Sequence, residues 1–570
     1  MKKVLLLLLI ALIVTLSMVL FSCDDVTSSE GLEFTLNMDG LSYSVTGIGV
    51  CKDTDIVIPD TYEGLPVTSI GEGAFFECLS FTSIKIPDSV TSISNQAFSL
   101  CESMTSIEIP DSVTSIGDQA FWACTSITSI VLPDSVTSIG KDAFRSCISL
   151  TSINIPDSVT SISSFAFSNC RSLESIVLPP SVTSIGSYAF DLCISLTSMN
   201  IPYSVTSIGK EAFYECTALE SIKISDSVTS IGEGAFDGCT SLKNVYYEGD
   251  AKDWLGISFD SSRSNPMCNG AYLYFNNELV NEFIAPDGVT SLGEYAFYGC
   301  TSITSAEIGN SVASIDNNAF TNCKSLRSIE IGDSVTSIGW DAFWNCTSLE
   351  NITISNSVTN IGNNAFGYCT SLENIVIPDS VTSIGERVFG YCSSLKSVEI
   401  GDSVRSISKY AFQECASLTN IVIPDSVTSI DNCAFWNCTS LENITIPNSV
   451  TDIGHMAFYG CTSLESIDIG NSVTKIGDSA FCGCTSLESI VIPDSVTSIG
   501  MDAFRSCISL ARIEIGDSVT SIGYSAFQEC TSLTIYCEAT SKPSGWDSEW
   551  NLLNYFTHET VPVVWGYTGN

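Results

Sequence analysis

The sequence predicts a repeat solenoid: a right-handed coil with a parallel β-sheet on one face and short strands and 3₁₀ turns on the other. Three observations predict this fold. A cysteine recurs every 23 residues, a nearly constant apolar pattern surrounds each cysteine, and 570 residues with 44% hydrophobic content exceed what one compact core normally supports. A fixed period of this length is typical of short coils that stack to share one continuous core.

The N-terminus has the pattern of an export signal. Met1, Lys2 and Lys3 form a basic start, and an apolar run follows at residues 4–20. This arrangement predicts a signal peptide over residues 1–22. Ordinary cleavage of that peptide and an uncleaved membrane anchor remain alternatives to lipidation, although the run is short for a transmembrane helix.

Small Ser22 immediately before Cys23 resembles the lipobox of bacterial lipoproteins, although the bulky Phe21 departs from its strictest form. The resemblance implies that Cys23 is the site of lipid attachment and the first residue of the mature chain. The polar residues that follow predict a flexible tether over 23–32.

Residues 33–77 are expected to form an N-terminal cap and the first coil. Alternating apolar residues at 33–36 and 43–47, and the run at 55–58, predict strands. A cap is needed because the first coil would otherwise expose an open sheet edge.

Two repeat arrays are predicted, at residues 78–245 and 285–534. A typical 23-residue unit is PDSVTSIGDQAFWACTSITSIVL, from Pro110 to Leu132. The periodic cysteines are Cys78, Cys101, Cys124, Cys147, Cys170, Cys193, Cys216 and Cys239, and then Cys300, Cys323, Cys346, Cys369, Cys392, Cys415, Cys438, Cys461, Cys484, Cys507 and Cys530.

Each unit contains three segments in order. The pattern L-x-S-I-x-I alternates as a strand does, and stacked copies of it make one long parallel sheet. Pro or Gly ends this strand, Asp-Ser forms a turn, and S-V-T-S-I-G supplies a second short strand. The A-F-x-x-C segment then has a spacing suited to one tight helical or 3₁₀ turn.

The stretch 246–284 interrupts the period and is predicted to be an irregular insert. It contains Trp254 and Cys268, and apolar residues on both sides of Asn276-Asn277 predict a hairpin. An irregular coil that bends the solenoid and a protruding binding loop both fit this stretch.

Residues 535–570 are predicted to be a C-terminal cap. Their aromatic residues could cover the last coil or form a ligand platform. These residues are Trp546, Trp550, Tyr555, Phe556, Trp565 and Tyr567.

The periodic cysteines are predicted to be buried free thiols, because side chains in register on parallel strands have poor geometry for a disulfide. The alternative is partial pairing among cysteines outside the ladder, namely Cys51, Cys268, Cys433, Cys482 and Cys537. Stacked turn aspartates, such as Asp88 and Asp111, are expected to accept hydrogen bonds from their own turns, with calcium binding as the alternative. The sequence indicates no metal site and no cofactor.

Composition limits the function. Asp and Glu outnumber Lys and Arg by 64 to 22, so the net charge of −42 repels nucleic acid. His455 and His558 are the only histidines and lie far apart in the sequence, which disfavours histidine-dependent catalysis. We therefore expect no enzymatic activity.

Variable positions within the constant repeat indicate where a ligand could bind. The strand centres, such as Lys85, Val177 and Glu514, should line the concave face. A second zone flanks Ala-Phe and is rich in large aromatics, which suit protein or glycan recognition but could instead pack on neighbouring coils. The candidate ligand-binding residues are Trp122, Tyr214, Tyr298, Trp340, Trp344, Tyr368, Tyr391, Trp436 and Tyr459, and Tyr188 and Tyr410 lie in the same zone.

The consensus SVTSIGxxAFxxCxSLxxIxIP resembles the 23-residue leucine-rich repeats of the BspA type, which occur in surface proteins of anaerobic bacteria and some parasitic protists. The resemblance implies a leucine-rich-repeat-like coil and a cell-surface lipoprotein that acts as an adhesin or protein-binding scaffold. The implied partners are extracellular matrix or cell-surface proteins, or glycans, with membrane attachment through the lipid anchor on the outer cell surface. A periplasmic or envelope scaffold without a host ligand is the alternative.

Overall fold

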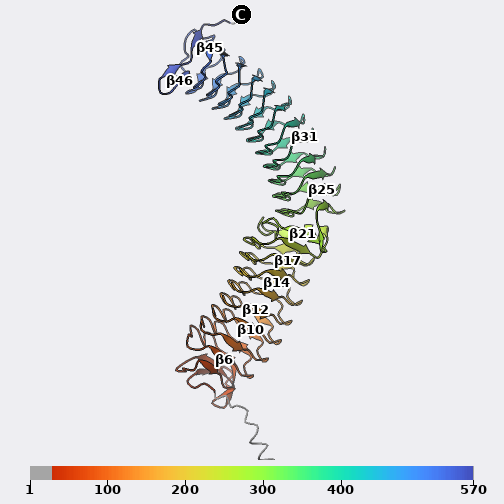
Figure 1. Cartoon of the computed structure of the whole chain (residues 1–570), viewed down its shortest axis with the longest axis vertical. Helices are drawn as coiled ribbons and strands as arrows, with labels where there is room; N and C mark the ends of the chain where they lie inside the picture. The colour runs from red at the N-terminus through yellow and green to blue at the C-terminus, as the bar shows by residue number, and fades with distance from the viewer. Residues whose placement is uncertain (1–27, 569–570) are drawn as a thin grey trace, which may run out of the picture. The chain divides into compact units, whose positions relative to one another are not determined.

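A computed structural model describes residues 28–568. Residues up to Leu196 form one compact unit, and residues from Thr197 form a second. Each unit is a parallel β-solenoid whose coils contribute one strand to a main row and, in most coils, one short strand to a second row (Figure 1). The predicted solenoid fold with a parallel sheet is therefore confirmed.

The N-terminal unit carries three groups of strands. Its main row is β3 (Asp55–Val57), β6 (Ser83–Lys85), β8 (Ser106–Glu108), β10 (Ser129–Val131), β12 (Ser152–Asn154) and β13 (Ser175–Val177). Its second row is β5 (Leu65–Ile70), β7 (Ser92–Ile93), β9 (Ser115–Ile116), β11 (Ser138–Ile139) and β14 (Ser184–Ile185). Before the first coil, β1 (Glu33–Leu36) pairs with β2 (Tyr43–Gly47), and β4 (Thr61–Tyr62) pairs with β5.

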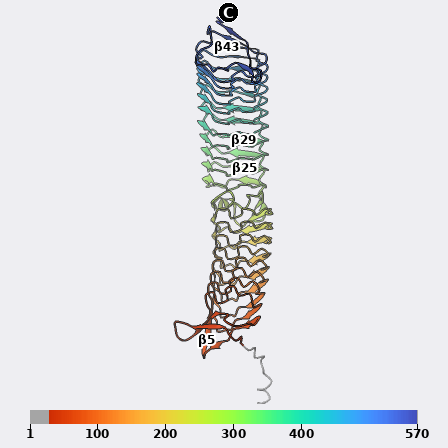
Figure 2. The same ribbon diagram turned by 90° about the vertical axis from the view of Figure 1, so that its left-hand side faces the viewer.

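The C-terminal unit repeats the arrangement as columns of rungs (Figure 2). Its main row is β15 (Ser198–Asn200), β17 (Ser221–Ile224), β19 (Asn244–Tyr247), β21 (Tyr272–Phe275), β23 (Glu282–Ile284), β25 (Ser305–Ile308), β27 (Ser328–Ile331), β29 (Asn351–Thr353), β31 (Asn374–Ile377), β33 (Ser397–Ile400), β35 (Asn420–Ile421), β37 (Asn443–Thr445), β39 (Ser466–Asp468), β41 (Ser489–Val491), β43 (Arg512–Ile515), β45 (Thr534–Cys537) and β48 (Val563–Trp565).

The second row of this unit consists of strands of two residues. They are β16 (Ser207–Ile208), β18 (Ser230–Ile231), β20 (Ser258–Phe259), β24 (Ser291–Leu292), β26 (Ser314–Ile315), β28 (Ser337–Ile338), β30 (Asn360–Ile361), β32 (Ser383–Ile384), β34 (Ser406–Ile407), β36 (Ser429–Ile430), β38 (Asp452–Ile453), β40 (Lys475–Ile476), β42 (Ser498–Ile499) and β44 (Ser521–Ile522). Outside the two rows lie α2 (Ala251–Leu255), β22 (Glu278–Leu279), β46 (Leu552–Asn554) and β47 (Glu559–Thr560).

The register of the sheet follows the sequence period. Ser129 pairs with Ser152 and Ile130 with Ile153, so each strand residue faces its equivalent 23 positions later. The isoleucines point inward and are buried, whereas strand-centre residues such as Val177 are exposed. The alternation predicted for these strands is therefore present, with one side chain in the core and the next in solvent.

Two internal rows fill the core beside the sheet. The phenylalanines of A-F-x-x-C stack ring on ring, with centroids 5.3–5.6 Å apart from Phe75 to Phe190 and 5.1–5.6 Å apart from Phe297 to Phe527. The cysteines form the adjacent row. All 24 cysteines among residues 28–568 are free, and within the repeats only Cys78 is not fully buried. Free, buried thiols were expected, and the alternative pairing outside the ladder is not found there.

The insert is an additional, longer coil within the solenoid. Asn244 of β19 pairs with Tyr272 of β21, 28 residues later, and β21 then turns back through Asn276 and Asn277 into β22. Both turn asparagines have positive φ, as a tight hairpin turn requires. The hairpin lies where the sequence predicts it, although its second strand is shorter than the predicted run and α2 was not expected.

Cys268 belongs to the ladder, contrary to the sequence interpretation. The segment Ser264-Asn265-Pro266-Met267-Cys268 takes the place of A-F-x-x-C, because the Cys268 N–H donates to the Asn265 carbonyl (3.0 Å) and the Cys268 thiol donates to the Phe236 carbonyl (3.7 Å). Asn265 thus stands where other coils have phenylalanine, and the ring stack is interrupted there.

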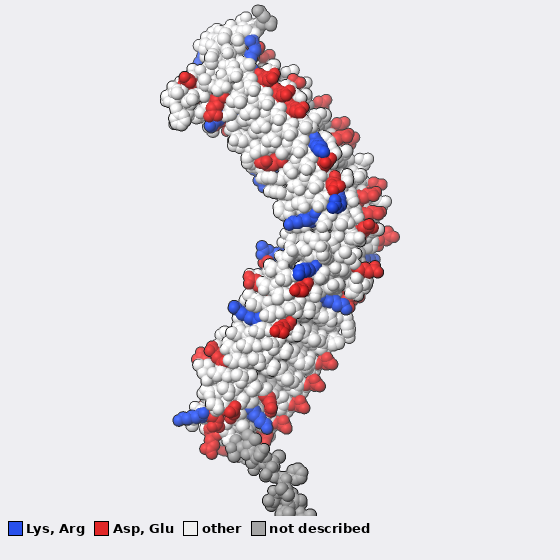
Figure 3. Space-filling view, in the orientation of Figure 1, with Lys and Arg blue, Asp and Glu red and all other residues white. Residues whose placement is uncertain are grey.

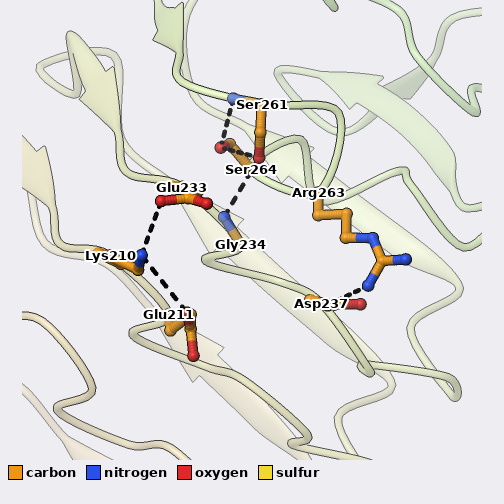
Figure 4. A network of polar contacts seen from close by, with 8 residues as sticks. All are labelled: Lys210, Glu211, Glu233, Gly234, Asp237, Ser261, Arg263 and Ser264. Atoms are coloured by element: carbon orange, nitrogen blue, oxygen red, sulfur yellow. Dashed lines mark hydrogen bonds and ion pairs between the residues drawn. The ribbon is translucent and has the colours of Figure 1, made fainter.

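Polar contacts connect the insert to the coil before it (Figure 4). Arg263 pairs with Asp237, and the N–H of Gly234 donates to the Ser261 hydroxyl at 3.3 Å. On the far side, buried Trp254 donates its indole N–H to the Ala296 carbonyl at 2.8 Å. The Asn265 amide donates to the carbonyls of Tyr295 and Ala296. Side-chain bonds here add to the backbone pairing of β18 with β20 and of β19 with β21.

Candidate functional site

The A-F-x-x-C segment is a run of turns that presents side chains to solvent. In this segment the backbone N–H groups donate alternately to the next coil and to their own turn. The Phe343 N–H donates to the Ala365 carbonyl of the next coil, and the Trp344 N–H donates to the Asp341 carbonyl three residues back. The residue before the alanine position and the residue before cysteine have positive φ, as at Asp341 and Asn345. This backbone leaves the residue after phenylalanine half-buried at Trp344, although the same position is buried at Ser99 and Thr321.

Four of the nine candidate aromatics lie together in one groove in the C-terminal unit. Tyr298 and Trp344 follow the phenylalanine of their coils, and Tyr368 and Tyr391 precede the cysteine of theirs. The groove has a volume of about 500 Å³ and is completed by polar side chains. Its polar lining residues are Asn318, Thr321, Asp341, Asn364 and Arg387.

The aromatic side chains of this groove contact one another. The rings of Tyr368 and Tyr391 stack with centroids 4.4 Å apart and an interplanar angle of 10°. The Trp344 ring meets Tyr368 edge-on at 5.5 Å. The Gln413 amide donates to the Tyr391 hydroxyl at 2.9 Å. These contacts hold the rings in place although Tyr368 remains 38% exposed.

The polar side of the groove has one carboxylate and one guanidinium. Burial raises the pKa of Asp341, against an opposing contribution from the Asn364 amide. The Thr321 hydroxyl is nearly buried and donates to the Asp341 carbonyl oxygen. The Arg387 guanidinium lies over the Tyr410 ring, 4.5 Å from its centroid. The groove therefore offers amide, hydroxyl, carboxylate and guanidinium groups beside aromatic faces.

Two glycines that the sequence analysis did not single out lie one residue before the two stacked tyrosines of this groove. Gly367 and Gly390 follow phenylalanine, where neighbouring coils carry Trp344, Gln413 or Trp436. Neither glycine has positive φ, although a Cβ at Gly367 would approach the Trp344 ring to 3.1 Å and the Asn364 carbonyl to 3.3 Å. The dipeptide Gly-Tyr before cysteine in two successive coils was the available sequence signal.

The remaining candidates do not join this groove. Trp436 contacts Tyr459 and Tyr410 in a second aromatic cluster, with centroids 6.3 and 6.5 Å away. Among the residues the structure describes, its indole nitrogen has no hydrogen-bond partner. Trp340 is 60% exposed on the flank of its coil. Trp122 and Tyr214 are half-buried, and no aromatic ring contact is recorded for them in the described part.

Several residues of the turn aspartate row bond to the next coil, which was not expected, whereas Asp226 accepts from the Ser225 and Ser227 hydroxyls of its own turn at 3.5 Å. Asp379 accepts from the N–H of Asp402 at 2.9 Å, and Asn310 accepts in the same way from Asp333 at 2.8 Å. Because asparagine accepts equally well, both residue types occur in the row. Within residues 28–568, no group of three or more histidine, cysteine or acidic side chains is arranged to hold a metal ion.

The export signal and the lipid-attachment candidate Cys23 lie outside the described residues. Over residues 28–568, no helix has the length and apolar character needed to cross a membrane.

Comparison with known proteins identifies the repeats. The model of the BspA type leucine-rich repeat region matches residues 50–173, 137–264, 270–396, 359–486 and 405–534. A search of curated protein sequences finds no match.

Solved structures of bacterial leucine-rich repeat proteins resemble the chain. A leucine-rich cell surface protein of Faecalibacterium prausnitzii A2-165 is 32% identical over 69% of this chain and 93% of its own, with a TM-score of 0.35. A leucine-rich repeat protein of Bacteroides ovatus ATCC 8483 is 25% identical over 95% of this chain and 99% of its own, with a TM-score of 0.27. The matched repeats span most of the sequence, and the chain belongs to the BspA-type leucine-rich repeat family.

Proposed function

We propose that this protein is a surface-displayed binding scaffold that acts as an adhesin toward matrix proteins or other cells, and that it has no enzymatic activity. One observation carries the proposal: Tyr298, Trp344, Tyr368 and Tyr391 gather in a solvent-accessible groove on a solenoid whose core positions hardly vary. Partly exposed aromatics that are held rigidly contribute most of the binding energy in many interfaces.

Two further points support surface display. The similar protein of Faecalibacterium prausnitzii is described as a cell surface protein. In this chain, Cys23 follows a basic and apolar leader, so lipidation at Cys23 would attach the solenoid to a membrane through the tether at residues 23–32.

Adhesion of intact cells tests the function. Cells that produce the protein should bind immobilised matrix proteins or partner cells, and cells with the gene deleted should not. Tyr368→Ala with Tyr391→Ala should weaken adhesion in the complemented strain, whereas Trp340→Ala, an exposed aromatic outside the groove, should not. Equal adhesion by the deleted strain would exclude the adhesin role.

Exposure of the solenoid and its anchor need separate measurements. Protease added to intact cells should digest a surface-displayed solenoid, and survival of the protein would favour a periplasmic scaffold. Cys23→Ser should abolish metabolic labelling with palmitate and release the protein from the membrane fraction. Labelling that persists in this variant would exclude Cys23 as the lipid site.

A further inference from the structure

The groove of Trp344, Tyr368 and Tyr391 is a hollow built into the solenoid surface. Along the row that follows phenylalanine, Gly367 and Gly390 lie between two coils that carry Trp344 and Gln413. A Cβ at Gly390 would meet its nearest neighbour, the Arg387 Cβ, at an ordinary 3.4 Å. The backbone therefore tolerates a Cβ at Gly390, which lies one residue before Tyr391.

The two tyrosines occupy backbone positions that disfavour large residues. Tyr368 and Tyr391 have φ of 61° and 64°, in the left-handed region. Elsewhere in this row of the C-terminal unit the residue is glycine, asparagine, serine or glutamate, as at Gly460. Left-handed backbone at a bulky residue costs about 1–2 kcal/mol. Left-handed backbone recurs at this row throughout the repeats, also at Leu100 and Leu192, so what distinguishes these two coils is the adjacent pair of tyrosine rings.

The polar groups around the tyrosine pair define the ligand chemistry. Asp341, Asn364 and Thr321 present carboxylate, amide and hydroxyl groups, and Arg387 adds a donor. One carboxylate and one guanidinium leave the groove without a strong net charge. The protein as a whole carries −42, and acidic side chains line an edge of each unit in view (Figure 3). An anionic ligand is therefore disfavoured, and a ligand rich in neutral hydroxyl groups matches these donors and acceptors.

The backbone at the groove is closed to peptide strands. The N–H of Tyr368 donates to the Gly390 carbonyl at 2.8 Å, and the N–H of Tyr391 donates to the Gln413 carbonyl at 2.7 Å. A peptide cannot add a strand where these bonds to the next coil are already made. Recognition must instead come from the ring faces and the polar side chains.

We infer that this groove binds a neutral pyranose unit of a glycan, with the apolar C–H face of the sugar against the solvent-exposed surface of the stacked Tyr368–Tyr391 pair and its hydroxyls on Asp341 and Asn364. A hydroxyl group can donate to the carboxylate while it accepts from the amide, and the volume of about 500 Å³ accommodates a small ligand. The inference rests on the proposed role as a surface-displayed binding protein and specifies the ligand of its groove.

Binding to an array of neutral oligosaccharides tests the inference, with the purified full chain as the sample. Each neutral oligosaccharide is paired with its sialylated form. The protein should bind neutral members, and calorimetry with the best of them should show roughly tenfold or greater weakening by Tyr368→Ala and by Tyr391→Ala. Gly390→Trp should block the groove while leaving both tyrosines in place. Tyr459→Ala, in the second aromatic cluster, should leave binding unchanged.

Several outcomes would overturn the inference. Binding only to sialylated members, no binding to any neutral member, or equal loss in the Tyr459→Ala control would each do so. Circular dichroism of every variant ensures that a loss of binding is not a loss of fold. Cells that adhere through a protein without glycan binding would leave the adhesin role standing and exclude the glycan. Glycan binding by a protein that confers no adhesion would support the glycan site and exclude the adhesin role.

Discussion

The thiol of Cys346 donates a hydrogen bond to the backbone carbonyl of Phe320 in the preceding coil, with 3.2 Å between sulfur and oxygen. The same carbonyl accepts the N–H of Cys323 in its own turn at 3.1 Å. Successive coils repeat this pair of bonds, as Cys124 and Phe98 show at 3.1 Å. The cysteine row therefore joins neighbouring coils through directed bonds as well as through packing, which explains why a small apolar residue does not take its place.

Removing one thiol should weaken the solenoid at that coil. Cys346→Ala removes the bond to Phe320 and leaves a small cavity, so we expect a loss of about 1–3 kcal/mol in the free energy of unfolding. Thermal melts followed by circular dichroism measure the change. The matched control is Cys482→Ala, because Cys482 is 9% exposed and its thiol makes no hydrogen bond to another coil among the described residues. A loss in the control as large as that in Cys346→Ala would contradict the role of the bond.

Alkaline pH should unfold the protein. Burial raises the pKa of Cys147 and of Cys346 to about 12, from an ordinary value of 9.0. Folding therefore favours the protonated thiol, so stability is complete below about pH 9 and falls as the pH rises toward 12. Each such thiol would cost about 4 kcal/mol at the upper end. Thiolate absorbance near 240 nm should appear together with the loss of circular dichroism, and gradual ionisation of the folded protein would disprove the coupling.

Glycine should stabilise the left-handed positions of the turns. Ala123 precedes Cys124 and has φ of 56°, whereas Ala120 in the same coil precedes Phe121 and is fully buried. Ala123→Gly should raise the free energy of unfolding by about 1 kcal/mol, because it relieves backbone strain. Ala120→Gly should lower it by a similar amount. Chemical denaturation distinguishes the two variants, and the same sign for both would refute the interpretation.

The insert should be the place where the C-terminal unit opens most readily after mutation. Asn265→Ala removes the amide donors to Tyr295 and Ala296, which lie in the first coil of the second array. We expect a loss of about 1–3 kcal/mol and faster hydrogen exchange near residues 285–300. Trp254→Phe, which removes one donor and keeps an aromatic ring, should give a smaller effect at the same place. Unchanged exchange there in both variants would show that these bonds do not hold the coils together.

The periodic features of the fold could be predicted because they depend only on the side chain that recurs at each position of the repeat. Isoleucine alternation in L-x-S-I-x-I predicts the sheet and its buried face, and constant Phe and Cys predict the internal rows. Cys268 was misplaced because counting by 23 fails inside a coil of 28 residues, and only the contact with Phe236 reveals its position. The bonding of Asp379 to the next coil was missed for a related reason, since the sequence does not show which neighbouring N–H group is left open.

The candidate groove was predictable only in part. Large aromatics beside Ala-Phe marked Tyr298, Trp344, Tyr368 and Tyr391, yet the same criterion selected Trp122 and Tyr214, which stand apart. Which aromatics lie together in one groove depends on neighbours 23 residues away, in the adjacent coils.

The sequence by itself determined the solenoid, its period and its free buried thiols, because each coil repeats the same local pattern and stacking is the only way to bury it. Tertiary structure decided the rest. It placed Cys268 in the ladder, directed the thiols to the Phe carbonyls, and brought Trp344, Tyr368 and Tyr391 to one groove. Those relationships join residues of different coils, so their geometry exists only once the coils have stacked.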